Sequence, residues 1–224
     1  MTQPKPLLGL LRRRELLVPT WKGWLALLLA VLIAGFIVMR GTYGFLAVND
    51  PLPGGILVLE GWSPEFTIAE ALAEHQRNHY REFLVTGGPI ELGNSLIDYK
   101  TYADLGAATL AKWGVSADAI HAVPAPSVER DRSYASGVAV RKWLRERGIA
   151  AEKINIVGNG SHSRRTRLVY QMAFGSEAKV GISTSPEKDF DPQRWWASSQ
   201  GFKAVVGELI AYTYTRLFFS PRKE

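Results

Sequence analysis

From residue 55 onwards, short runs of apolar residues alternate with longer stretches of amphipathic pattern. The runs are bounded by Gly, Pro or Ser, and their length is typical of strands buried on both faces of a parallel sheet. They predict five strands, at 56–59, 83–85, 120–123, 154–157 and 180–182. The stretches between them predict helices at 65–78, 99–114, 131–148 and 161–174, followed by an unusually apolar helix at 201–217.

Strands that alternate with helices form right-handed βαβ units. We therefore expect an α/β fold, a Rossmann-like three-layer sandwich with a mostly parallel sheet of about five strands. Glycines stand where three of the helices should stop: Gly114, Gly148 and Gly175.

A different pattern occupies the first fifth of the chain. No residue from Gly23 to Met39 carries a charge, and roughly 17–20 such residues cross the hydrocarbon core of a bilayer. A buried core helix is the alternative, but such helices rarely stay apolar on every side for this length. Aromatic residues flank both ends, as in the belts at membrane interfaces: Trp21, Trp24, Tyr43 and Phe45. The pattern predicts one N-terminal transmembrane helix over 21–46, with the lipid bilayer as its partner.

The charge of the chain is concentrated beside this helix. Of the 27 Lys and Arg residues, six lie in residues 1–49 with one of the 21 acids, so this part carries +5 of the net +6. The rest of the chain is nearly neutral, so nucleic acid is not an expected partner. The chain has no cysteine, which excludes disulfides, thiolate zinc sites, iron–sulfur clusters and a cysteine nucleophile.

The position of these bases predicts the orientation in the membrane. Five bases precede the apolar segment and only Arg40 closely follows it, which favours a cytoplasmic N-terminus. A cleaved signal peptide fits less well, because the basic segment is long and Phe45 interrupts the small-residue pattern that would end at Ala47. We expect a single-pass protein of the inner (plasma) membrane with an extracytoplasmic, periplasmic domain. Its parts are a basic cytoplasmic segment (1–20), a signal anchor (21–46), a linker (47–55) and the α/β domain (56–224).

Ligands of open α/β sheets bind beyond the carboxyl ends of the strands. Four predicted loops lie there: 60–62, 86–88, 124–133 and 158–162. Cationic side chains begin two of the helices that follow, and helix N-termini attract anions. We therefore expect a negatively charged ligand that carries phosphate or carboxylate. The candidate ligand-binding residues are Gly61, Thr86, Gly87, Gly88, Asp131, Arg132, Ser133, Asn159, Ser161 and Arg165.

His162 and Glu60 are the candidate catalytic residues. A carboxylate at the end of a buried strand needs a partner. Glu60 is therefore either a general base or the structural mate of an arginine, because ion-pair networks resemble catalytic sites. Gly87 and Gly88 are explained equally well by a tight turn.

Several familiar sites are incomplete in this sequence. Ser163 replaces the third glycine of a dinucleotide fingerprint in the run 158–163, and no G-x-S-x-G elbow occurs. His75 and His79 are spaced like zinc ligands, but no acidic neighbour completes the motif. We therefore expect no metal site and no cofactor. The two tryptophans at 195–196 form either a platform on which a sugar stacks or part of the core or membrane-proximal packing.

Four segments resemble the ElyC/SanA/YdcF family, a bacterial envelope-associated family whose activity is largely unassigned: 55–62, 83–88, 131–144 and 154–175. The most specific matches are the TGG at 86–88 and the HSRRT at 162–166, which fits the family's H-x-x-R signature. The resemblance implies a Rossmann-like domain behind a membrane helix, with a pocket at the strand ends. Further matches resemble a subgroup found with exopolysaccharide gene clusters.

The chain also departs from this family. Glu60 stands where many members have a second glycine, and the glutamate common after the TGG is replaced near Tyr102. The segment 133–136 lacks the acidic member of the family's T-x-E-N pattern. If those acidic residues take part in a reaction in the relatives, this chain would use Glu60 or Asp131 in their place. One member is linked with S-adenosylmethionine, which an exported domain would not meet, so the resemblance adds no cofactor.

Two functions follow as hypotheses. The first is an envelope enzyme, a hydrolase or transferase, that acts on a phosphorylated or lipid-linked saccharide in cell-surface polysaccharide or cell-wall biogenesis. Arg132 and Arg165 would hold the anion, with His162 as acid or base and Glu60 as its partner. The second is a non-catalytic binding or assembly factor for envelope or exopolysaccharide export that uses the same pocket.

Overall fold

The computed structural model describes residues 17–91 and 96–221. Most of the expected cytoplasmic segment, up to residue 16, therefore lies outside the described residues. The chain divides into two compact units, Met1–Met39 and Arg40–Glu224. The boundary falls inside the segment predicted to be the anchor.

Helix α1 (Trp21–Leu46) has the bounds of that predicted segment and is long and apolar enough to cross a membrane. Its end, from Arg40 on, belongs to the second unit. There Leu46 is fully buried and Thr42 is 9% exposed. The packed end of the helix is therefore part of the folded domain, and the uncharged run that ends at Met39 is the membrane candidate.

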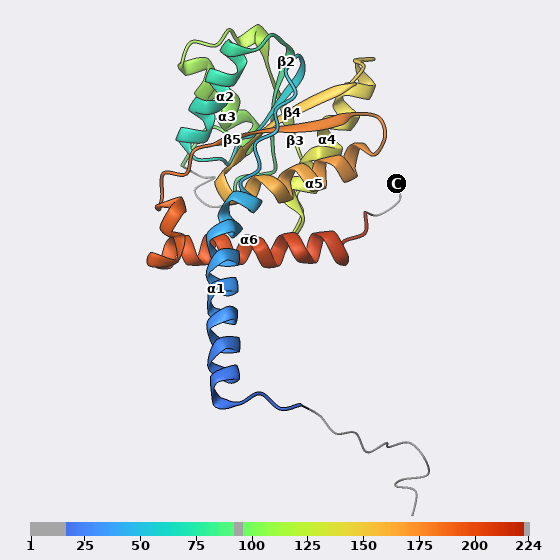
Figure 1. Ribbon diagram of the computed structural model, residues 1–224. Helices are drawn as coiled ribbons and strands as arrows, with labels where there is room; N and C mark the ends of the chain where they lie inside the picture. Colours follow the sequence, from blue (N-terminus) through green and yellow to red (C-terminus); the bar gives the residue numbers. More distant parts are fainter. Residues whose placement is uncertain (1–16, 92–95, 222–224) are drawn as a thin grey trace, which may run out of the picture. The chain divides into compact units, whose positions relative to one another are not determined.

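The second unit is built on a sheet of five strands, all paired in parallel in the order β3-β2-β1-β4-β5 (Figure 1). This confirms the expected α/β fold and each of the five strands. The strands are β1 (Gly55–Glu60), β2 (Tyr80–Gly87), β3 (Ile120–Pro124), β4 (Lys153–Asn159) and β5 (Lys179–Ser185).

Alternate residues of the strands point to two apolar cores, because successive side chains of a strand face opposite sides. Ile56 and Val58 belong to the core under α4 and α5, whereas Leu57 and Leu59 belong to the core under α2 and α3. The helices of the two outer layers are α2 (Glu65–Arg77), α3 (Tyr102–Lys112), α4 (Arg132–Glu146) and α5 (Ser163–Phe174). Gly148 has a φ of 66° just after α4 ends, a backbone conformation that favours glycine.

The segment predicted as a linker is ordered against the sheet. Asp50 forms an antiparallel bridge with Ile182 of β5, and the Leu52 amide donates to Asn155 Oδ1 at 3.1 Å. An edge strand presents backbone N–H and C=O groups without partners. Asp50, which precedes β1, exchanges two backbone hydrogen bonds with Ile182 of the edge strand β5. Within this predicted linker, residues 48–50 therefore pair with β5, and Gly55 is the first residue of β1.

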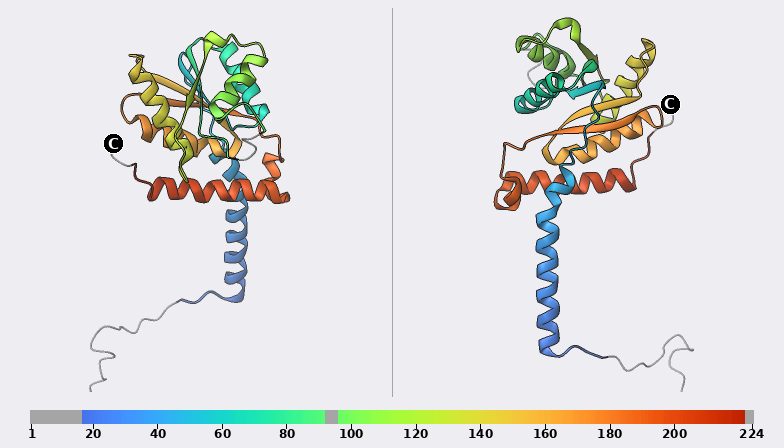
Figure 2. Two further views of the ribbon diagram at one scale, coloured as in Figure 1. Left: turned by 180° about the vertical axis from the view of Figure 1, so that it is seen from behind. Right: turned by 45° about the horizontal axis from the view of Figure 1, so that its top comes forward.

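The last helix, α6 (Ser199–Leu217), is the apolar helix expected at 201–217. It follows a 3-10 segment, η4 (Pro192–Ala197), and begins where the Ser198 hydroxyl accepts from the Gly201 amide at 3.0 Å. It packs against α5 and the short 3-10 turn η3 (Gly160–His162), along one edge of the domain (Figure 2).

Candidate functional site

The centre of the sheet provides the crevice in which we expected a ligand. From β1 the chain moves to β2 and β3 on one side, and β4 and β5 lie on the other. The carboxyl ends of β1 and β4 therefore flank the topological switch point, where ligands of such folds bind. Glu60 is the last residue of β1 and Asn159 the last of β4.

Glu60 is 3% exposed and faces a group of polar side chains. The Tyr170 hydroxyl lies 3.5 Å from its Oε1. Burial raises the pKa of Glu60, and the nearby charges of His162 and Arg165 and a hydrogen bond from Ser133 only partly oppose this. Glu60 therefore holds a proton more firmly than an ordinary glutamate.

Glu208 of α6 is the direct partner of the two cationic candidates. Arg165 donates to both of its carboxylate oxygens, from Nε at 2.8 Å and from Nη2 at 3.0 Å. His162 Nδ1 lies 2.9 Å from Glu208 Oε1. Burial alone would raise the pKa of Glu208, but the hydrogen bonds and charges of His162 and Arg165 lower it to about 2. Glu208 is thus a stable carboxylate.

This carboxylate determines which nitrogen of His162 is available. Nδ1 also lies 2.9 Å from Arg165 Nη2, but Nδ1 cannot both accept from the arginine and donate to Glu208. We assign the proton to Nδ1, because two acceptors 2.9 Å apart would repel. A neutral His162 then presents Nε2 as an acceptor, the arrangement in which a carboxylate orients a histidine base. Sequence reasoning gave this partner role to Glu60, and the structure gives it to Glu208.

A prediction follows for Glu60. The pKa of Glu60 is higher in the folded protein than in the unfolded chain. Protonated Glu60 therefore contributes fully to stability at pH values below its unfolded pKa, and this contribution is lost as pH rises through its folded pKa. Glu60→Gln removes the ionisation and keeps the shape. We expect its free energy of unfolding to rise relative to wild type as pH increases from about 4.5, measured by denaturant titration of the full chain at several pH values. Glu65→Gln, at an exposed position of α2, is the control. A constant difference across pH for Glu60→Gln would contradict the burial argument.

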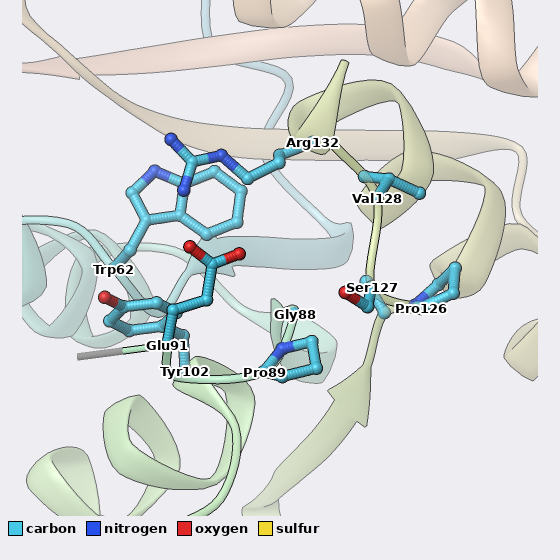
Figure 3. Close-up of a pocket in the computed structure, with 10 residues that line it drawn as sticks. Trp62, Gly88, Pro89, Glu91, Tyr102, Pro126, Ser127, Val128 and Arg132 are labelled. Carbon is cyan, nitrogen blue, oxygen red and sulfur yellow. The ribbon is translucent and has the colours of Figure 1, made fainter. Parts of the chain in front are cut away.

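A narrow pocket lies among the loops that follow β1, β2 and β3 (Figure 3). Trp62 follows β1, Tyr102 begins α3 and Arg132 begins α4, and all three side chains face the same space. The rings of Trp62 and Tyr102 meet edge to face, with centroids 6.5 Å apart. The cavity itself is only about 20 Å³, room for about one water molecule, so a larger ligand would lie across its mouth. Glu91 is also directed towards the Arg132 guanidinium.

The pocket and the buried cluster are connected through the backbone. Glu60 lies in the cluster and Trp62, two residues later, lines the pocket. Arg132 lines the pocket, and the next residue, Ser133, hydrogen-bonds Glu60. The pocket therefore lies among the loops after β1, β2 and β3, and Trp62 and Arg132 connect its lining to Glu60 along the chain.

The predicted glycines have different roles. A Cβ on Gly61 would lie 2.0 Å from the Tyr102 carbonyl oxygen, and one on Gly87 would lie 2.7 Å from the Tyr102 Cβ. These two glycines allow α3 to approach the strand ends. Gly88 is different, because it lines the pocket and a Cβ there would be in ordinary contact with the Pro126 oxygen at 3.5 Å.

Four of the other predicted ligand-binding residues are polar side chains around the cluster. The side-chain oxygens Thr86 Oγ1 and Asn159 Oδ1 are buried without a hydrogen-bond partner among the described residues. Such atoms cost about 1–3 kcal/mol unless water or a ligand binds them. Ser161 is 5% exposed in η3, and Asp131 precedes α4 at a φ of 61°. A non-glycine residue at this φ is rare away from turns and functional sites.

The site also contains residues that sequence reasoning missed. Glu208 and the pocket residues Trp62, Tyr102 and Glu91 were not among the candidates. A signal for Glu208 exists in the sequence, because it is the only charged residue between Lys203 and Arg216. Among the described residues, no group of three or more His, Cys, Asp and Glu could hold a metal ion.

Comparison with known proteins gives only weak similarities. No family model matches this chain, and no curated protein matches it. Two solved structures of pantothenate synthetase from Thermus thermophilus are similar to it, with TM-scores of 0.35 and 0.33. In both cases the identity is 12%, and the alignment covers 74% of this chain and 69% of the other. Similarity this low carries no argument about the site, so the fold is identified by the sheet order and the site by its own geometry.

Proposed function

We propose that this chain is a membrane-anchored protein of the bacterial envelope that binds an anionic, phosphate- or carboxylate-bearing saccharide and acts on it as a hydrolase or transferase. Two observations carry the proposal: the His162–Glu208 pair just after β4, and a pocket among the loops after β1, β2 and β3 that combines aromatic rings with a guanidinium group.

The acid–base chemistry is supported by two carboxyl groups whose environments shift their pKa values in opposite directions. Burial raises the pKa of Glu60, whereas the cations lower that of Glu208. Such pairs are typical of sites that separate acid and base roles. His162 Nε2 would take the proton from the attacking water or sugar hydroxyl while Glu208 stabilises the imidazolium. The deprotonated oxygen would bond to the sugar carbon that carries the phosphate as the bond between this carbon and the phosphate oxygen breaks, and the phosphate would leave as an anion without an additional acid.

The ligand class is supported by the pocket. Trp62 and Tyr102 offer the apolar ring surface on which a sugar can lie, and the Arg132 guanidinium can donate two parallel hydrogen bonds to a phosphate or carboxylate. Arg165 is less available for this role than we expected from the sequence, because Glu208 already accepts two of its hydrogen bonds. Arg132 is therefore the main anion-binding residue of the proposal.

The envelope location is supported by α1 and by the basic residues that precede it. With a cytoplasmic N-terminus, the domain would lie on the outer side of the inner membrane, where lipid-linked saccharides are assembled into polymers. Membership of the ElyC/SanA/YdcF family, and of its exopolysaccharide-associated subgroup, remains part of this proposal.

Ligand binding can be tested at Arg132. Arg132→Ala removes a charged hydrogen-bond donor worth about 1.5–3 kcal/mol, so we expect about 10- to 100-fold weaker binding of a polyprenyl-phosphate-linked saccharide, measured by calorimetry on the full chain in detergent. The matched control is Arg130→Ala, which removes the same charge from an exposed residue outside this pocket. Equal affinity for the wild type and both variants would contradict the assignment of the pocket.

The second candidate function is a non-catalytic binding or assembly factor for envelope or exopolysaccharide export. The near-complete burial of Glu60 favours it, because a residue 3% exposed does not touch a ligand in this conformation. Binding that depends on Arg132, without turnover, is the result that would select this alternative.

A further inference from the structure

The outer face of α6 carries few of the charges that normally cover a helix at a protein surface. The face towards the domain carries the buried residues Gly201, Val205 and Thr215, together with Glu208. The opposite side carries four apolar or aromatic residues at helical spacing, with Lys203 and Thr213 beside them: Val206, Ile210, Tyr214 and Leu217. Ile210 is 65% exposed and Leu217 is 67% exposed.

The charge on this outer face is Lys203 near its start, two turns before Ile210, and Arg216 lies near its end. Lys203 and Arg216 are exposed, and between them the only charged residue is Glu208, which faces the domain. Further large apolar side chains, Phe202 and Phe218, are more than half exposed near the two ends of the helix. A helix exposed to water has polar residues on its outer face, whereas a helix at a membrane interface has an apolar face flanked by bases.

Contacts within the domain join the end of α1 to η4 and α6. Arg40 follows directly after the uncharged run. Its Nη1 donates to the Gln193 carbonyl at 3.2 Å, and its guanidinium lies 5.9 Å from the centroid of the Trp196 ring. Phe45 meets Tyr212 of α6 edge to face, with centroids 5.6 Å apart. The residues that emerge from the apolar run therefore touch η4 and α6 directly.

We propose that the outer face of α6 docks on the surface of the bilayer that α1 crosses. This inference rests on the proposed membrane anchoring and adds a second, interfacial contact. If the run that ends at Met39 lies in hydrocarbon, then Arg40 lies at the headgroups, together with the η4 residues that it contacts. Ile210 and Leu217 then enter the interface, and Lys203 and Arg216 meet anionic headgroups.

A second copy of this chain is the competing occupant of the same face. The bilayer is favoured because Arg40 follows directly after the uncharged run, and Arg40 and Phe45 contact η4 and α6. The bases near the ends of α6 would repel those of a second copy if the two faces met about a twofold axis, whereas they complement anionic lipid.

The chain has no cysteine, so single-cysteine variants can carry a fluorophore at chosen positions of the full chain in phosphatidylglycerol-containing nanodiscs. The test positions are Ile210→Cys and Leu217→Cys. Leu29→Cys in the uncharged run of α1 reports on the anchor, and Lys142→Cys, on a side chain that is 75% exposed on α4, reports on water. We expect emission at 210 and 217 to shift to shorter wavelength, with quenching by nitroxide lipid and protection from iodide, as at 29. The label at 142 should keep its longer emission wavelength, should not be quenched by nitroxide lipid, and should be quenched by iodide.

Each other outcome overturns the proposal in a distinguishable way. Labels at 210 and 217 that are quenched by iodide, beside a lipid-quenched label at 29, show an anchored domain without docking. Labels at 210 and 217 protected from both quenchers show a protein partner on this face. If nitroxide lipid does not quench the label at 29, the apolar run does not lie in the bilayer. This result contradicts the membrane anchoring, and the docking proposal that rests on it.

Discussion

Replacing Glu208 with glutamine is expected to lower the free energy of unfolding by about 2–3 kcal/mol at neutral pH, because it leaves the partly buried guanidinium of Arg165 without its counter-ion. Glutamine also has one acceptor oxygen where Glu208 has two, and these now accept from both Arg165 and His162. If the chain is an enzyme, turnover should also fall, by about 10²-fold or more. The measurement is denaturant unfolding of the purified full chain, combined with a turnover assay.

The pH dependence of this effect has a definite sign. The folded pKa of Glu208 is lowered from 4.5 to about 2, so its contribution is present above the unfolded value and is lost as pH falls towards the folded value. The unfolding free energies of wild type and Glu208→Gln should therefore converge as pH falls from 4.5 towards 2. Glu177→Gln is a matched control, since this glutamate pairs with Arg145 at an exposed site and should change stability by no more than about 1 kcal/mol. A difference for Glu208→Gln that stays the same at acid pH would show that no ion pair is held there.

Gly61→Ala is expected to destabilise the domain by about 3 kcal/mol or more, the upper range for overpacking. The new Cβ would lie 2.0 Å from the Tyr102 carbonyl oxygen and 2.7 Å from its carbonyl carbon. These are backbone atoms, so relief requires α3 to move as a whole. A Cβ on Gly106 of α3 would likewise lie 2.9 Å from the Gly61 Cα, which shows how closely the helix crosses this loop.

Gly88→Ala serves as the control for this substitution, because its Cβ would be in ordinary contact with the Pro126 oxygen at 3.5 Å. We expect its denaturation midpoint to remain close to that of wild type. The pair separates the two roles considered for these glycines. A Gly61→Ala protein with wild-type stability but without ligand binding would restore the ligand-binding role expected from the sequence and contradict the packing role.

The fold could be predicted from the sequence because its elements have local signals. Apolar runs such as 154–157 are too short for a helix, and parallel strands are buried on both faces, so each run reads as a strand. Positive φ at Gly114 and Gly148 agrees with the predicted helix ends. The N-terminal apolar helix could also be predicted from the sequence. The burial of Leu46 in the domain could not, because an apolar residue is compatible with both lipid and a protein core.

The candidate site was only partly predictable, because its central contact joins distant segments. Glu208 and His162 are 46 residues apart, and only the packing of α6 on η3 brings them together. His162, Arg165 and Glu60 come from the ends of two strands, and the charges of His162 and Arg165 lie near enough to Glu60 to lower its pKa against the effect of burial. The partner of His162 depended on a helix that the βαβ pattern does not place.

Turnover by wild type and His162→Ala, compared at matched ligand binding, is the most direct test of the central claim that the His162–Glu208 pair performs chemistry on a ligand in this crevice. The full chain in nanodiscs would be given a polyprenyl-phosphate-linked saccharide, with binding and release of the sugar product followed in parallel. We predict that both proteins bind the lipid-linked saccharide with similar affinity and that only the wild type releases product. Equal release by His162→Ala, or binding by the wild type without any release, would contradict the account.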